Sequence, residues 1–316
     1  MTTQYLQIND ESAWLEKRGK YVTSTEISAL YGLNPWMTAF ELYHNKHGNI
    51  DTSLDDNNFL RFGRILEQPI CEMILIEKPQ WKISPMRVFA YDDTDMIGAS
   101  FDRVVTLEDG RVGLLEIKSI SYAKYKEKFI EHADDDIEAP ENYEVQIQAQ
   151  MEVIQRYDFC VLAVFILDTR QLKFIFRERD RELGAKLRQA ARDFWAMEAA
   201  PEPDYARDKS ILAKVAPSAD PNNTLDATND TRITELAAMY KAEKELEKQS
   251  KANADKFYTE LIALLGSARY AWTNHHKITV SDIKPSQGKE ITPDMVGEYI
   301  GAREGFKRLT ISEVKK

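Results

Sequence analysis

The chain has 316 residues, 43% hydrophobic and 30% charged, enough for one large globular domain with an appendage, or for two domains. No stretch approaches the length of a membrane span, so we expect no membrane partner. Only Cys71 and Cys160 are present, which excludes a cysteine-ligated iron–sulfur cluster or zinc ribbon built from this chain alone and suits a reducing cytoplasm. The net charge of −10 does not exclude DNA, because basic residues gathered in a groove still bind phosphates.

The first part of the chain has the pattern of helices. Thr23-Ser24-Thr25-Glu26 is typical of a helix start, and Asn34-Pro35 ends that helix before a second one over 38–46. Apolar spacing predicts a longer helix over 59–78, which Pro69 can kink.

The middle of the chain alternates strands and helices. Strands are predicted over 86–91, 96–107 and 112–120, followed by a helix over about 142–155, a hairpin of strands 159–167 and 172–177, and a closing helix over 181–197. This order favours an α/β fold with a mixed central sheet flanked by helices.

The composition changes near residue 200. The proline-containing and polar segment 201–230 predicts a linker. Residues 231–265 predict a long helix whose middle is polar almost all round, and a short hairpin follows it. We therefore expect a domain over 1–200, a linker over 201–230 and a mainly helical C-terminal extension over 231–316.

Two neighbouring segments place acids and a lysine together. Asp102 ends one apolar stretch, and Glu116-Ile117-Lys118 lies inside the next, across a turn indicated by Asp109-Gly110. Glu116 and Lys118 share a strand face because they are two residues apart. Two carboxylates and a lysine can hold a divalent cation and handle the proton of an attacking water. The triplet alone also fits a solvated strand face with an ion pair, although its apolar neighbours favour an interior strand.

Further motifs surround this pair of segments in a fixed order. Trp14-x-x-x-Arg18 and Thr23-Ser24-Thr25-Glu26 precede it, as does Phe62-Gly63-Arg64-x-x-Glu67. Ser100-x-Asp102 lies within it, and Tyr143-x-x-Gln146-x-Gln148 follows. Taken singly, these residues also fit a surface arginine, an N-cap or solvated helix faces. Together, from Trp14 to about Gln150, they resemble the phage exonuclease family of lambda exonuclease and the YqaJ-like viral recombinases, which are PD-(D/E)XK nucleases.

The resemblance implies a role for each matching residue. It implies a PD-(D/E)XK restriction-endonuclease-like core in which Asp102, Glu116 and the Ile117 backbone carbonyl ligate metal, with Glu67 as an additional acid. Phe101 departs from the proline that names the motif, at a position that varies in these nucleases. Lys118 would orient water and stabilise charge, and Gln146 would position the water or the scissile phosphate, with Gln148 as a second candidate. A 5′-phosphate site would comprise Arg18, Thr25 and Ser100.

The resemblance also implies an activity. It implies a Mg²⁺-dependent 5′-to-3′ exonuclease on linear double-stranded DNA, with one or two metal ions and Mn²⁺ able to substitute. The products would be 3′ single-stranded overhangs for recombination by strand annealing. The implied partners are DNA ends, a single-strand annealing protein and two further copies in a trimeric ring, in the cytoplasm of a bacterial host of a phage or prophage.

Two other functions remain open from the sequence. A structure- or sequence-specific endonuclease of the same fold would also cut closed circular DNA. A non-catalytic DNA-end-binding scaffold would cut nothing, and the acid-acid-lysine set disfavours it because buried charges cost stability.

Overall fold

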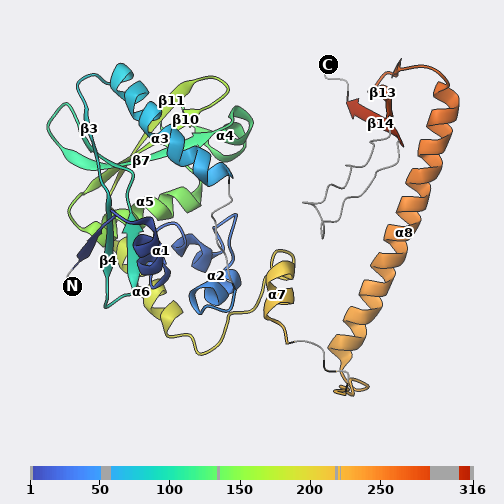
Figure 1. Cartoon of the computed structure of the whole chain (residues 1–316), viewed down its shortest axis with the longest axis horizontal. Coiled ribbons are helices and arrows are strands. Elements are labelled where there is room, and N and C mark those ends of the chain that lie inside the picture. The colour runs from blue at the N-terminus through green and yellow to red at the C-terminus, as the bar shows by residue number, and fades with distance from the viewer. Residues whose placement is uncertain are drawn as a thin grey trace, which may run out of the picture. The chain divides into compact units, whose positions relative to one another are not determined.

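The computed structural model describes residues 3–50, 58–133, 136–217, 220, 222–284 and 306–313. The chain divides into two compact units, Met1–Ser218 and Ala219–Lys316 (Figure 1). The helices of the first unit are α1 (Glu11–Gly19), the 3₁₀ helix η1 (Ile27–Tyr31), α2 (Ala39–Lys46), α3 (Asn58–Glu77), α4 (Tyr122–Lys128), α5 (Glu141–Ile154), α6 (Arg181–Trp195) and α7 (Lys209–Val215). Its strands are β1 (Gln4–Gln7), β2 (Val22–Thr23), β3 (Lys82–Pro85), β4 (Val88–Asp92), β5 (Ile97–Ser100), β6 (Arg103–Thr106), β7 (Val112–Ile120), β8 (Ile130–Glu131), β9 (Ile137–Glu138), β10 (Phe159–Ile166) and β11 (Gln171–Glu178).

The main sheet of the first unit has the strand order β11-β10-β7-β6-β3. Strands β7 and β10 are parallel and the other pairs are antiparallel. Helix α3 covers one face, where Ile70 and Ile74 join Leu115 and Ile117 in one apolar cluster. On the other face Leu114 packs with apolar residues of α5, and Tyr125 of α4 packs with residues of β10. The structure thus confirms the expected α/β core, a mixed sheet flanked by helices.

A second sheet has the strand order β1-β4-β5-β2. Its strands β4 and β5 come directly before strand β6 of the main sheet in the sequence. The prediction of one strand over 96–107 was wrong, because β5 belongs to this sheet and β6 to the main one. The backbone pairing between the strands is interrupted at Asp102. The Asp102 side chain replaces a backbone carbonyl there, because its Oδ2 accepts a hydrogen bond of 2.8 Å from the Ile117 amide. The chain therefore passes from one sheet to the other between Ser100 and Arg103.

Other local expectations hold. The turn after β6 closes with a hydrogen bond of 2.9 Å from the Leu107 amide to the Arg111 carbonyl, and Gly110 supplies the positive φ of 85° that such a turn requires. Helix α3 continues through Pro69. The expected helix after Thr23-Ser24-Thr25-Glu26 is only the short η1, and Gly32 ends it in the left-handed conformation.

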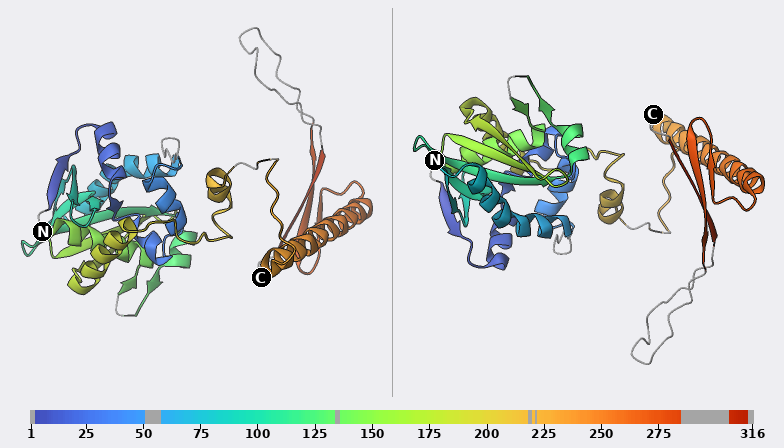
Figure 2. Two further views of the ribbon diagram at one scale, coloured as in Figure 1. Left: turned by 90° about the horizontal axis from the view of Figure 1, so that it is seen from below. Right: turned by 90° about the horizontal axis from the view of Figure 1, so that it is seen from above.

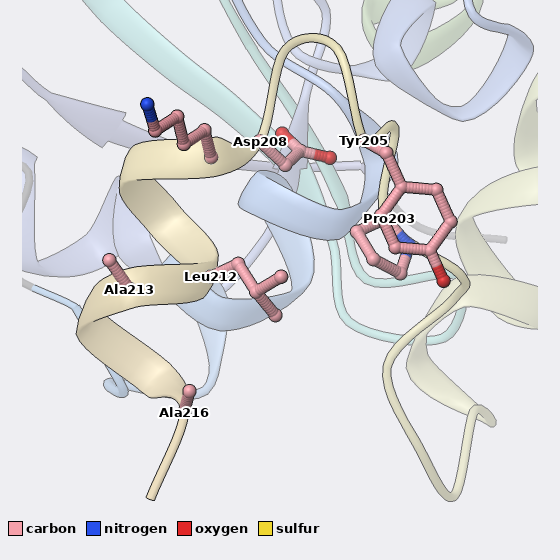
Figure 3. A pocket seen from close by; sticks show the side chains of 7 residues that line it. Pro203, Tyr205, Asp208, Leu212, Ala213 and Ala216 are labelled. Atoms are coloured by element: carbon pink, nitrogen blue, oxygen red, sulfur yellow. The ribbon is translucent and has the colours of Figure 1, made fainter. Parts of the chain in front are cut away.

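The segment 201–230, expected to be a linker, contains α7. Ile211 of this helix is buried with Phe40 and Ile50, and the buried Asp208 accepts a hydrogen bond of 2.7 Å from Thr38. A shallow pocket of about 300 Å³ lies beside α7, and no candidate site residue lines it (Figure 3). Its lining residues are Pro203, Tyr205, Asp208, Lys209, Leu212, Ala213 and Ala216.

The second unit contains a helix and a sheet. Helix α8 (Thr231–Leu265) has the predicted bounds, and the strands β12 (Tyr270–Trp272), β13 (His276–Ile283) and β14 (Phe306–Glu313) form one antiparallel sheet (Figure 2). The expected hairpin is β12–β13, whereas β14 was not predicted. The rest of the predicted extension, 285–305 and 314–316, lies outside the described residues. Across the described ranges, no helix is long and apolar enough to cross a membrane.

A buried ion network joins three parts of the first unit. Arg188 of α6 pairs with Glu152 of α5 at 2.6 Å, with Asp92 at the end of β4 at 3.1 Å, and with Asp95 of the β4–β5 connection at 2.7 Å. The Arg188 side chain is 3% exposed, so water does not stabilise its charge, and Arg188 and the carboxylates around it stabilise one another instead.

We expect Arg188→Met to lower the free energy of unfolding by roughly 3–5 kcal/mol, because it leaves buried carboxylates without their cation. Chemical denaturation measures the change. Arg181→Met is the control: its pair with Asp158 is about three-quarters exposed on both sides, so the change should stay within about 0.5 kcal/mol. Equal effects of the two substitutions would contradict a structural role for the network.

Candidate active site

Glu116 lies at the centre of the site, on the middle strand β7. It is 3% exposed, and three donors hold its carboxylate. Oε1 accepts hydrogen bonds from Lys118 Nζ at 2.7 Å and Gln146 Nε2 at 2.6 Å, and Oε2 accepts one from Gln150 Nε2 at 2.8 Å. Glu116 and Lys118 therefore share a face as expected, and the carboxylate is held in one orientation.

Asp102 lies beside Glu116, after the break between the two sheets. Burial raises the pKa of Asp102 well above its ordinary value, and the nearby Glu116 charge raises it further. Oδ2 accepts from the Ile117 amide, and Oδ1 has no hydrogen-bond partner among the described residues. In a strand the amide and carbonyl of one residue face the same edge, so the Ile117 carbonyl faces Asp102 as well.

Lys118 is the cation that faces both acids. Burial alone would lower the pKa of Lys118, but the Glu116 and Asp102 carboxylates outweigh burial and raise this pKa above its ordinary value. Its Nζ also lies 5.2 Å from the centre of the Tyr143 ring. One lysine against two carboxylates leaves negative charge in excess on this face of the sheet.

Glu67 reaches the edge of the site from α3, where Arg103 holds it. The Glu67 carboxylate lies 3.2 Å from Arg103 Nη1, which also donates to the Asp102 carbonyl at 2.7 Å. Burial raises the pKa of Glu67, and the Arg103 charge opposes this rise. Arg103 contacts Oε2 of Glu67, and no hydrogen bond to Oε1 is found among the described residues.

Helix α5 contributes glutamines to the site, and one of them was missed. Gln146 donates to Glu116, whereas Gln148 does not reach the site. Gln148 Nε2 donates to the Glu178 carbonyl at 2.9 Å and its Oε1 accepts from the Asp180 amide at 2.8 Å, which joins α5 to the end of β11 and the start of α6. The second glutamine of the site is Gln150. Helical spacing was the missed signal, because residues four apart share a helix face and residues two apart do not.

The residues expected to bind a phosphate also come together. Arg18 Nη2 donates to Thr25 Oγ1 at 2.9 Å, and Trp14 Nε1 donates to Ser100 Oγ at 3.1 Å. The Arg18 guanidinium lies 5.4 Å from the centre of the Trp14 ring, and that of Arg64 lies 5.8 Å from it. We call Trp14, Arg18, Thr25 and Ser100 the hydroxyl–arginine cluster.

A buried ion pair supports this cluster from behind. Lys46 Nζ lies 2.8 Å from Glu26 Oε2 and donates to the Arg18 carbonyl. Burial would raise the pKa of Glu26, but the Lys46 and Arg18 charges lower it below its ordinary value. Glu26 also accepts a hydrogen bond from the Thr23 amide, which fixes the turn that carries Thr25.

Gln150 links the two groups of residues. Its Nε2 donates to the Ser100 carbonyl at 3.0 Å as well as to Glu116. Ser100 and Asp102 are separated only by Phe101, which is buried. The hydroxyl–arginine cluster and the acids are therefore parts of one connected site.

The donors at the acids fit Mg²⁺ better than a metal that needs a full protein cage. Among the residues that the structure describes, no three His, Cys, Asp or Glu side chains are arranged to hold a metal ion. Mg²⁺ keeps several waters and commonly takes one or two carboxylates, which Asp102 and Glu116 could supply, and the Ile117 carbonyl could add a third oxygen. The excess negative charge at the site favours such a cation.

Comparisons with known proteins agree with the motifs. Residues 13–156 match the family model described as YqaJ-like viral recombinase domain, which confirms the resemblance over the segment that holds every site residue named above. The chain is 28% identical over 316 residues to the uncharacterized protein YqaJ of Bacillus subtilis (strain 168), across 95% of this chain and 94% of that protein.

Solved structures give weaker similarities. An alkaline exonuclease from Laribacter hongkongensis is 20% identical with a TM-score of 0.45, across 58% of this chain and 91% of that chain. The structure of that exonuclease in complex with dAMP gives a TM-score of 0.44 at 20% identity, across 59% of this chain and 91% of that chain.

We expect Mg²⁺ to stabilise the wild-type protein and not Asp102→Asn, because the substitution removes a charged ligand. At ten times its dissociation constant, a ligand that binds only the folded state adds about 1.4 kcal/mol, which thermal melting detects as a shift of a few degrees. Asp109→Asn, an exposed acid in the β6–β7 turn, should retain the shift. An undiminished shift in Asp102→Asn would exclude Asp102 as a ligand.

Proposed function

We propose, on the premise that residues 13–156 form a YqaJ-like viral recombinase domain, that this protein is a Mg²⁺-dependent 5′-to-3′ exonuclease. Its substrate would be linear double-stranded DNA, and its product would carry 3′ single-stranded overhangs for recombination. The observation that carries the proposal is the connection of the hydroxyl–arginine cluster to the acids through Gln150. One part can bind a terminal phosphate while the other acts on a neighbouring phosphodiester.

Asp102, Glu116 and the Ile117 carbonyl would hold the metal ion, with Glu67 as an additional acid at the edge of the site. One or two Mg²⁺ ions would bind, with Mn²⁺ able to substitute. A bound divalent cation lowers the pKa of a coordinated water and neutralises charge on the phosphate. Gln146 and Gln150 keep the Glu116 oxygens turned toward the site.

Lys118 would act on the attacking water and the phosphate. Its ammonium group lies 2.7 Å from Glu116 and is held near Asp102, so it is fixed where negative charge accumulates during hydrolysis. A positioned cation stabilises the charge that develops on the phosphate oxygens, and its N–H groups can orient the water. This role needs no movement of the side chain.

Polarity would come from the hydroxyl–arginine cluster. The Arg18 guanidinium offers a fork of N–H donors that matches phosphate oxygens, and the hydroxyls of Thr25 and Ser100 add donors beside it. An enzyme that reads a terminal 5′-phosphate needs a DNA end. This requirement separates the proposal from an endonuclease of the same fold.

The proposed partners rest on the family resemblance. They are DNA ends, a single-strand annealing protein and two further copies of the chain in a ring that encloses DNA. We place the activity in the cytoplasm of a bacterial host, from a phage or prophage gene; the relative in Bacillus subtilis supports a bacterial setting.

Linear duplex with a 5′-phosphate should be degraded in Mg²⁺ and preserved in EDTA, while a closed circle should survive both. We expect Lys118→Ala to lower the rate at least 100-fold, because it removes about 3 kcal/mol or more of charge stabilisation. A gel assay of both DNA forms measures this.

Lys124→Ala is the matched control, since this lysine is exposed and pairs with Glu127 on its own helix. Cutting of the circle would replace the proposal with an endonuclease. Absence of cutting from both DNA forms would favour the scaffold.

The hydroxyl–arginine cluster has its own test. Arg18→Ala should reduce the preference for 5′-phosphorylated over 5′-hydroxyl ends by roughly 10- to 100-fold, the worth of hydrogen bonds to a charged group. Competition between the two ends in one reaction measures the preference. Lys20→Ala, on an exposed lysine paired with Glu16, should leave it unchanged. A preference that survives Arg18→Ala would place the phosphate elsewhere.

A further inference from the structure

Helix α8 presents large apolar side chains to solvent. None of its 35 residues is buried. Among the exposed ones are Ile233, Leu236, Tyr240, Phe257 and Leu264, of which Leu264 is 77% exposed. A helix of this length without a single buried side chain gains little from propensity alone, so packing against another surface would stabilise it.

These side chains lie on one stripe of the helix. Starting at Ile233, alternating steps of three and four residues give the spacing of a coiled-coil seam. The positions, which we call the α8 stripe, are Ile233, Leu236, Tyr240, Glu243, Glu247, Ser250, Ala254, Phe257, Leu261 and Leu264. Leu261 is half-buried and the others are exposed. The stripe is apolar at both ends and polar in the middle.

The stripe matches itself when it is reversed. Laid antiparallel on a second copy, Ile233 meets Leu264, Leu236 meets Leu261 and Tyr240 meets Phe257, with the same three contacts repeated at the other end. Each contact joins side chains of similar size and kind: branched with branched, and aromatic with aromatic. Such layers can exclude water from both ends of the seam.

Charges in the middle of the stripe select this direction. In a parallel pair, Glu243 and Glu247 would each face their own copy, which places like charges together in the seam. In the antiparallel pair, Glu243 faces Ala254 and Glu247 faces Ser250, so no acid faces an acid. Lys244 already pairs with Glu247 on the same helix at 2.5 Å, which leaves that acid compensated.

We propose that α8 binds α8 of a second copy of this chain as an antiparallel two-helix coiled coil. The contact is two-fold, since each helix uses the same stripe. A two-fold contact cannot close a three-fold ring. The α8 pairing is therefore separate from the proposed trimer, and it would join either two chains or two trimeric rings. This proposal does not depend on whether the protein is a nuclease.

Disulfide trapping in the full chain tests the register. Tyr240→Cys and Phe257→Cys variants, mixed in equal amounts and oxidised, should give a cross-linked dimer, while each alone should give no more than wild type. The wild type corrects for the native Cys71 and Cys160, which are buried. Glu245→Cys mixed with Ala252→Cys is the matched control. These two residues lie at the same level of the pair, but each is on the outer surface of its helix and points away from the partner.

Cross-linking of either single variant by itself would overturn the antiparallel register. Cross-linking of the Tyr240→Cys and Phe257→Cys mixture no stronger than the outer-surface control would overturn the pairing, and would leave α8 covered by another surface. Light scattering gives a second measurement. We expect the mass of wild type to be twice that of Leu236→Glu/Leu261→Glu, with circular dichroism showing that the helix is retained. Ala238→Glu, on the outer surface, should keep the larger mass, and equal masses for all three would contradict the proposal.

Discussion

A carboxylate buried inside a sheet is costly unless every oxygen finds a donor, and the arrangement of the first unit follows from this requirement at Glu116. Lys118 on the same strand and two glutamines on α5 satisfy it. These contacts therefore require helix α5 to keep one position over the sheet and one rotation about its own axis. The Arg188 network holds the C-terminal turn of the same helix through Glu152, so the middle and the C-terminal turn of α5 are both fixed by buried polar contacts.

The two sheets divide the chemistry between them. The second sheet carries Ser100 and, through β2 and the turn after it, Thr25, whereas the main sheet carries Glu116 and Lys118. Asp102 lies where the chain passes from one sheet to the other. Its side chain is held because it accepts the hydrogen bond from the Ile117 amide in place of a backbone carbonyl. A side chain that substitutes for backbone pairing is fixed by the strands beside it, which would suit the role proposed for Asp102.

Periodicity predicted most elements of this fold, since β7, α8 and the β10–β11 hairpin follow from apolar spacing and turn residues alone. It could not predict the break at Phe101, because the apolar pattern runs on through a change of sheet that only tertiary pairing decides. Gln150 was missed although helical spacing places it on the same face of the helix as Gln146, because only tertiary packing decides which polar side chains of that face meet the sheet. Strand β14 pairs with β13 from a distance in the chain that local patterns do not span.

The single residue between Ser100 and Asp102 has a consequence for step size. Two residues of extended chain span at most about 7 Å, so the backbone itself limits how far Ser100 of the hydroxyl–arginine cluster can lie from Asp102. Successive phosphates of one DNA strand lie about 3.4 Å apart along the duplex axis, so only the linkages nearest a held terminal phosphate fall within such a reach. If one strand occupies both places, the polypeptide acts as a ruler. The product length would then be a covalent property of the chain, insensitive to how fast each cut occurs.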